Sequence, residues 1–156
     1  MRIDSLKIRL PTVGGIITEV SMARWSRTLG TLLGSGVPLL TALKASAGVA
    51  GNAAISKAAE GAIAEVREGK KLAEPLKASG LFPSYVTEMV SMGEESGALD
   101  AMLSKVADHY ERDVDQLVKN LTALLEPVMI LVMGGVVGFI VMAMLLPVFQ
   151  MQLMAG

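Results

Sequence analysis

The chain of 156 residues has no cysteine, one histidine and few aromatic side chains. Without cysteine it has no disulfide, no thiolate metal site and no cysteine nucleophile. The single histidine, His109, excludes a metal site built from several histidines and leaves no second histidine for a proton relay. Aromatic residues make up 4% and the net charge is −1, whereas nucleic-acid-binding proteins usually carry a basic patch with interleaved aromatics. We therefore expect no nucleic acid, metal or cofactor as a ligand.

Charge is also absent from the end of the chain. All 14 basic and 15 acidic side chains lie at or before Glu126, and none occurs from Pro127 to Gly156. The uncharged stretch Val128 to Val148 has 21 residues, and as a helix it covers roughly 30 Å, the thickness of a bilayer's hydrocarbon core. We therefore predict a transmembrane helix over residues 127–149. A buried core helix is the weaker alternative, because so long an uncharged stretch is rare in soluble cores.

Two further features bear on this predicted span. Gly134 and Gly138 form a G-x-x-x-G pair, a spacing that lets another helix approach closely, although glycine is common in spans generally. Basic residues, among them Arg112 and Lys119, precede the span, and none follows it. The positive-inside rule then places the N-terminal domain in the cytoplasm and the short tail, residues 150–156, on the other side of the membrane.

Before the span, the spacing of apolar residues is helical. Steps of three and four residues, punctuated by proline, glycine and Asn52 as an N-cap, predict six helices. They cover about Ser21 to Ser35, Pro38 to Val49, Asn52 to Gly69, Leu72 to Ser79, Pro83 to Glu95, and Leu99 onward. The last one meets no breaker before Pro127, so we expect it to run into the span. The predicted fold is all-α, a small antiparallel six-helix bundle over residues 21–126 whose last long helix continues into a C-terminal transmembrane helix.

Residues 1–20 are expected to form an extended or linker segment. Leu6, Ile8 and Leu10 alternate with charged residues, and Pro11 and Gly14-Gly15 are expected to break the segment.

Most polar side chains of the sixth predicted helix are expected to lie at the surface in contact with water. His109 is most simply a surface histidine. The charged face of the helix is most simply solvated and carries Asp108, Glu111, Arg112 and Asp115. Glu126 stands at the predicted membrane boundary, where an acid either pairs with a partner or lies among lipid headgroups, and both interpretations remain open.

Enzymatic motifs are weak. Gly69-Lys70-Lys71 resembles the end of a phosphate-binding loop, but Ala64 stands where that loop needs glycine, and Lys71 where it needs serine or threonine. Glu94 and Glu95 are adjacent, so on a helix they point in different directions and make a poor carboxylate pair for catalysis. The sequence therefore predicts a protein that is not an enzyme.

Five strings, in order, resemble the family of type II secretion system protein F, which includes the inner-membrane platform protein of type IV pili. They cover about residues 20–150 and comprise Arg27–Leu40, Ser79–Pro83, Gly93-Glu94-Glu95-Ser96-Gly97, Leu124-Leu125-Glu126-Pro127 and Leu145–Phe149. The resemblance implies a six-helix cytoplasmic bundle and an inner-membrane protein without enzymatic activity, with its C-terminus in the periplasm. It also implies a platform between a cytoplasmic assembly ATPase and pilin-like subunits, in contact with other inner-membrane subunits, lipid and further copies of itself. Candidate interaction residues are Gly93, Glu94, Glu95, Ser96, Gly97, Glu126, Pro127, Gly134 and Gly138.

The chain departs from the family pattern in one respect. Family members usually carry two copies of the helical domain and three spans, and these residues resemble the second copy and the last span. A truncated gene, a split gene and an isolated fragment would each have this form. Ser96 and Leu146 favour a type II secretion system over a pilus system.

Two alternatives remain. The chain as a tail-anchored adaptor or signalling protein would use its long helix for dimerisation, but two successive four-residue steps, ending with Tyr110 to Val114, interrupt strict heptads. The chain as a membrane-bound enzyme lacks a recognisable site.

Overall fold

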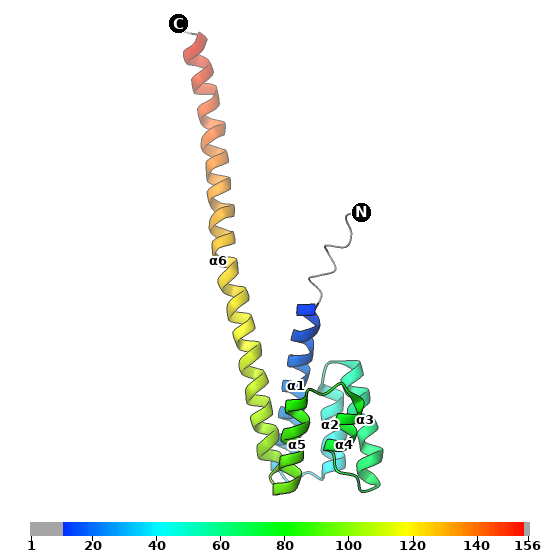
Figure 1. The fold of residues 1–156 in the computed structure, drawn as a ribbon. Coiled ribbons are helices and arrows are strands. Elements are labelled where there is room, and N and C mark those ends of the chain that lie inside the picture. The colour runs from blue at the N-terminus through cyan, green and yellow to red at the C-terminus, as the bar shows by residue number, and fades with distance from the viewer. Residues whose placement is uncertain (1–10, 155–156) are drawn as a thin grey trace, which may run out of the picture. The chain divides into compact units, whose positions relative to one another are not determined.

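A computed structural model describes residues 11–154, with side-chain surroundings for residues 14–150. Within this part the chain forms six helices and no strand (Figure 1). The helices are α1 (Pro11–Gly34), α2 (Leu39–Val49), α3 (Ala53–Arg67), α4 (Ala73–Ser79), α5 (Ser84–Ser96) and α6 (Leu99–Met154). The predicted all-α fold, with a long last helix, is confirmed.

The chain divides into two compact units. The first, Met1–Asp115, contains α1 to α5 and the beginning of α6, and the second, Gln116–Gly156, contains the rest of α6. The predicted division between a bundle over 21–126 and a membrane helix over 127–149 rests on charge rather than packing and stays a prediction. Since α6 runs to Met154, most of the expected tail at 150–156 is helical.

Helix ends follow local chemistry. The Asn52 side chain accepts hydrogen bonds from the backbone N–H groups of Ala54 and Ile55, at 2.9 and 3.3 Å, which confirms it as the N-cap of α3. Pro38 and Pro83 occupy the N-caps of α2 and α5, one residue before the helical position expected for them. Both have extended ψ angles, so each proline ends the preceding connection and aims the chain into the next helix.

The start of α1 corrects one expectation. The predicted extended or linker segment over residues 1–20 is wrong for residues 11–20, which are helical, while residues 1–10 lie outside the described residues. Proline is favourable in the first turn of a helix, because its missing N–H would have no intrahelical partner there. Gly14 and Gly15 each weaken a helix by only about 1 kcal/mol, which the packed remainder of α1 offsets.

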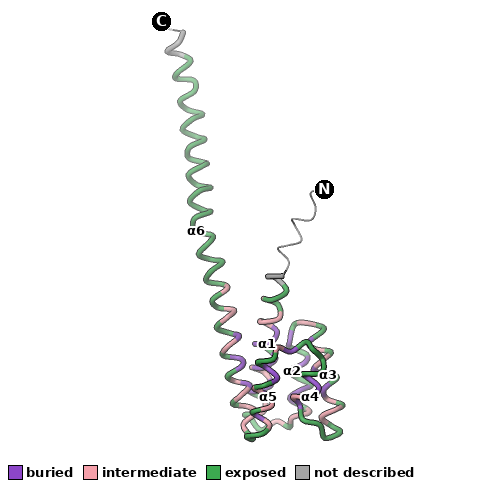
Figure 2. Tube along the Cα trace, in the orientation of Figure 1, coloured by how far each residue is buried: buried purple, intermediate pink, exposed green. Residues whose placement is uncertain are grey.

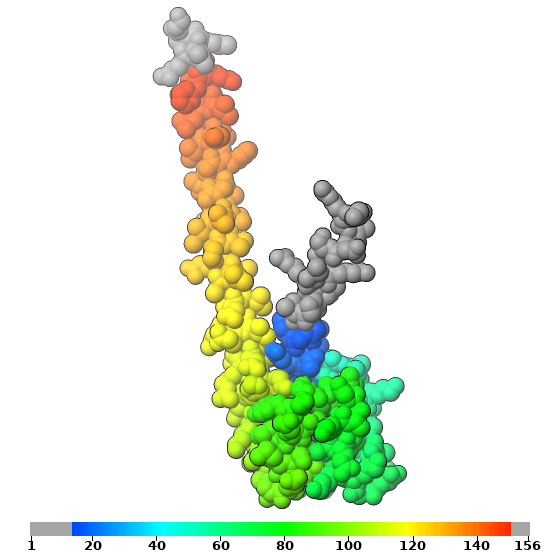
Figure 3. All heavy atoms as spheres, viewed as in Figure 1, coloured from blue at the N-terminus to red at the C-terminus, as the bar shows by residue number. Residues whose placement is uncertain are grey.

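The core lies among the helices of the first unit. Trp25 is fully buried and contacts Phe82 edge to face, with ring centroids 4.9 Å apart. Other large side chains without exposed surface come from α1, α2, α4, α5, α6 and the residue before α4, and they include Met22, Leu29, Leu43, Leu72, Leu76, Val86, Val90, Leu103 and Val106. Buried positions are confined to this region (Figure 2), and side chains fill the spaces between the ribbons (Figure 3).

Helix α6 continues without a break through Pro127 and Pro147. Every residue from Val118 to Gln150 is exposed (Figure 2). Among the described helices, α6 is the one long and apolar enough to cross a membrane. An apolar surface of this length has no stable place in water, which supports the predicted span.

Candidate functional site

The Gly93–Gly97 string forms the corner between α5 and α6. Gly93 is buried, and a Cβ added there would lie 2.8 Å from the Leu99 Cα, so only glycine allows the two helices to approach so closely. Gly97 has φ 69°, the left-handed conformation that ends many helices. The Ala98 N–H donates to the Gly93 carbonyl at 3.0 Å and closes the corner.

Glu94 reaches from this corner to another helix. Its carboxylate accepts hydrogen bonds from the backbone N–H groups of Leu72 and Ala73, at 2.5 and 3.0 Å. The N-cap residue of α4 itself, Leu72, provides no side-chain hydrogen bond. A carboxylate from α5 therefore caps α4 and lies at the positive end of its dipole.

The remaining residues of the string have different surroundings. The Ser96 hydroxyl donates to the Met92 carbonyl of its own helix at 2.7 Å. Glu95 is exposed and accepts a hydrogen bond from the Ser91 hydroxyl, at 3.3 Å. The two neighbouring acids thus face different partners, and Glu95 is the one that the fold leaves at the surface.

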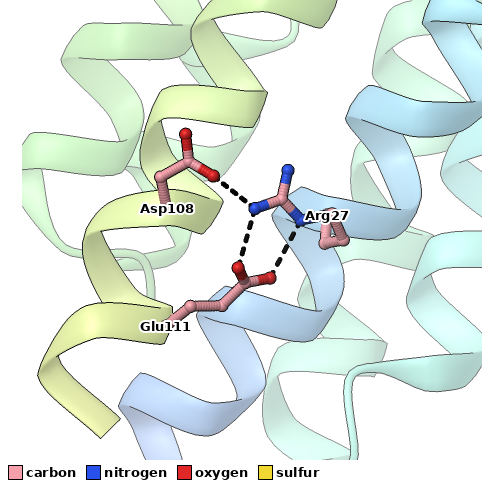
Figure 4. A network of polar contacts seen from close by, with 3 residues as sticks. All are labelled: Arg27, Asp108 and Glu111. Carbon is pink, nitrogen blue, oxygen red and sulfur yellow. Dashed lines mark hydrogen bonds and ion pairs between the residues drawn. The ribbon is translucent and has the colours of Figure 1, made fainter. Parts of the chain in front are cut away.

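A second polar cluster joins α1 to α6 (Figure 4). Arg27 donates through Nε and Nη2 to the two carboxylate oxygens of Glu111, at 2.9 and 2.7 Å, and through Nη2 to Asp108. These hydrogen bonds lower the pKa of Glu111, and both acids raise the pKa of Arg27. Asp108 and Glu111 are exposed, as the predicted solvated face requires. They are also paired, because α1 packs on α6 with Arg27 opposite them.

A groove of about 560 Å³ adjoins this cluster. Its charged lining comes from Arg24 and Arg27 on α1 and from Glu111 and Asp115 on α6. Its other lining residues are mostly apolar and comprise Val20, Ala23, Thr28, Val49 and Val114. Nothing in the sequence indicated this groove, because its walls on α1 and α6 are more than eighty residues apart in the sequence.

His109 is less isolated than a surface histidine. Its ring lies edge-on to Tyr85 and Tyr110, with centroid distances of 4.8 and 5.2 Å, and its Nε2 is 3.4 Å from an Asp113 carboxylate oxygen. Burial raises the pKa of Tyr110. Within the described residues, no three histidine or acidic side chains are grouped so as to hold a metal ion.

The other candidate residues lie in the second unit. Glu126 and Pro127 are exposed within α6, where the predicted span begins. A Cβ built at Gly134 or Gly138 would meet no atom within 4 Å. Within the described residues, both glycines therefore leave their side of α6 open.

The chain is similar in sequence to known proteins over most of its length. The profile of the family described as type II secretion system (T2SS), protein F, matches residues 25–147. The type IV pilus assembly protein PilC of Thermus thermophilus is 48% identical over 149 residues, covering 95% of this chain and 37% of that protein. PilC of Myxococcus xanthus is 42% identical over 148 residues, covering 95% and 36%. Type II secretion system protein F of Pseudomonas aeruginosa is 39% identical over 149 residues, covering 96% and 37%.

Two points follow from these relatives. The chain spans little more than a third of the length of the curated relatives it matches. The chain is more identical in sequence to these two pilus assembly proteins than to this secretion protein. This argues against the preference for a secretion system that Ser96 and Leu146 indicated.

The cap of α4 gives a first prediction. Glu94→Ala removes both acceptors from the start of α4 and should lower the free energy of unfolding by about 1–2 kcal/mol. Urea titration in detergent, followed through the fluorescence of the single, buried Trp25, measures this. Glu95→Ala is the matched control, with an expected change within about 0.5 kcal/mol. Equal losses in the two variants would contradict the capping role.

The Arg27 cluster predicts a pH dependence. The pKa of Glu111 is lowered in the folded state from an ordinary value of 4.5, so its contribution is present above pH 4.5 and is lost as the pH falls through the lowered pKa. Arg27→Met should cost about 0.5–1 kcal/mol at pH 7 and less at pH 3. Thermal unfolding at both values, with Arg24→Met as control, measures the difference. An equal cost at pH 3 and pH 7 would instead assign the effect to lost packing.

Proposed function

Because this chain belongs to the family of type II secretion system protein F, we propose that it is a non-catalytic platform, or scaffold, component of a bacterial inner membrane machine. The machine assembles type IV pili or operates type II secretion. The observation that carries this proposal is the family match over residues 25–147, which includes both the helical bundle and most of the apolar part of α6.

The proposed topology follows from charge. The bundle lies in the cytoplasm, α6 crosses the inner membrane over residues 127–149, and the C-terminus is periplasmic. Supporting this, Arg112 and Lys119 precede the span and no basic residue follows it. Since α6 is a single helix, no loop separates the bundle from the membrane segment.

The proposed partners are a cytoplasmic assembly ATPase, other inner-membrane subunits and pilin-like proteins. The platform couples the ATPase to the pilin-like proteins. On the bundle, Glu95 is the exposed acid of the Gly93–Gly97 corner and the best placed of these residues to contact a cytoplasmic partner. At the membrane, Glu126 and Pro127 form the proposed contact at the boundary. Gly134 and Gly138 offer a surface where a neighbouring helix can approach closely.

The ATPase contact is tested in one of the longer relatives. Deleting the part of PilC that matches residues 25–115 should reduce the amount of assembly ATPase recovered with it from detergent-solubilised membranes at least severalfold. Both forms must first be shown to resist carbonate extraction, so that loss of membrane insertion is excluded. Recovery equal to that of intact PilC would remove the claim for this domain.

The boundary acid gives a separate prediction. Glu126→Gln removes a charge but keeps the shape, and it should impair pilus assembly or secretion while leaving the protein in the membrane fraction. Asp115→Asn is the matched control on the same helix and should assemble normally. Wild-type piliation or secretion in the Glu126 variant would leave this carboxylate with no role beyond its place among headgroups.

A further inference from the structure

Helix α4 is the shortest of the described helices and lies between two glycines in the left-handed conformation. It has seven residues, whereas isolated helices of fewer than about 12 residues are marginal in water. It therefore keeps its helical shape only while it is packed in the bundle. Gly69 and Gly80, with φ 99° and 66°, bound it on either side. Glycine adopts such angles at little steric cost, so the chain can turn at both points. We call residues 71–79 the α4 segment.

The inner side of the α4 segment covers part of the apolar core. Leu72, Pro75 and Leu76 are buried, and neither leucine has any exposed surface. The segment packs on α3 and α5, and its leucines belong to the same apolar cluster as Val86 and Val90 of α5. Moving the segment away would therefore expose apolar surface that the closed bundle hides.

Glu94 provides the polar attachment of the α4 segment to another helix. Its two carboxylate oxygens accept hydrogen bonds from the backbone N–H groups of Leu72 and Ala73. Every other hydrogen bond of residues 72–79 in the described part of the chain joins two residues between Lys71 and Leu81. Breaking the two bonds to Glu94 therefore removes the hydrogen bonds that tie this segment to α5.

We propose that the α4 segment is a lid, which opens by turning at Gly69 and Gly80 and which Glu94 latches in the closed position. The α4 segment then opens separately from the bundle and more often than the bundle unfolds. Because the latch is a side chain, opening leaves the backbone of α5 in place. The device belongs to the bundle itself and does not depend on the proposed machine.

The latch stands on a rigid base and is easily released. Gly93 lets α5 touch the start of α6, and Gly97 ends α5, so the backbone that carries Glu94 is fixed by the corner. A rotamer change of Glu94 alone is enough to free both N–H groups of the α4 segment. Once the segment is open, these groups and the carboxylate can all bond to water, so no buried polar group is left unpaired.

Hydrogen exchange of the intact chain in detergent micelles, followed by mass spectrometry of peptic peptides, tests the lid. Amides within residues 74–80 should exchange at least tenfold faster than those of residues 25–29 in the buried part of α1. Low concentrations of urea should barely change the rate in the α4 segment, because its opening exposes little surface. Equal rates in the two regions at every urea concentration would mean that α4 opens only with the whole bundle, and would overturn the proposal.

Substitutions at the corner test the latch. Glu94→Ala should raise the exchange rate of the α4 segment at least fivefold, and Glu94→Gln, which keeps one carbonyl acceptor, should raise it less. Glu95→Ala, at the exposed neighbour, is the matched control and should leave the rate unchanged. An unchanged rate in Glu94→Ala, or an equal rise in Glu95→Ala, would show that Glu94 is not the latch. The comparison within the unaltered chain needs no substitution, so it decides whether the lid exists even if Glu94→Ala does not fold.

Discussion

The bundle depends on the contact between its first helix and the beginning of its last one. A Cβ at Gly30 of α1 would lie 3.2 Å from the Leu103 Cβ of α6, so the two backbones nearly touch. Trp25 and Leu29, on the same helix, are fully buried, and Arg27 is held by two acids of α6 at the edge of this contact. Since α1 and α6 are the two ends of the packed unit in the sequence, their contact brings together residues more than seventy positions apart.

Local chemistry made most of the helix boundaries predictable. Asn52 caps the helix that it was expected to cap, and helices begin within one residue of the positions expected for Pro38 and Pro83. The beginning of α1 was not predictable, since proline and glycine favour a break locally and only burial later in the helix outweighs them. The hydrogen bonds of Glu94 to the start of α4 and of Arg27 to two acids of α6 were also not predictable. Those bonds join residues 21 to 84 positions apart, and one sequence carries no signal at that range.

The string that first suggested the family turns out to serve the fold. Gly93 allows two helices to touch, Glu94 caps a third, and Gly97 turns the chain. Similarity in these residues is therefore evidence that the bundle is shared. The assignment to a pilus or secretion machine depends instead on the extent of the match and on the relatives that share it. The surfaces that would serve such a machine, Glu95 and the outside of α6, are those where the fold itself makes few demands.

The two prolines inside α6 have a consequence for the membrane. Proline has no N–H, so the carbonyls of Ala123 and Ala143, four residues before Pro127 and Pro147, lose their usual helical donors. A carbonyl without a donor is tolerable where water reaches it and costs several kcal/mol in hydrocarbon. The prolines are 20 residues apart, about 30 Å along the helix, which equals the thickness of the hydrocarbon core. Under the proposed topology the Ala123 carbonyl lies outside the span over residues 127–149 and the Ala143 carbonyl lies within it, so sliding the helix toward the periplasm brings a second carbonyl without a donor into lipid. The backbone around Pro127, and not only the charge of Glu126 beside it, would then oppose movement of the helix in that direction.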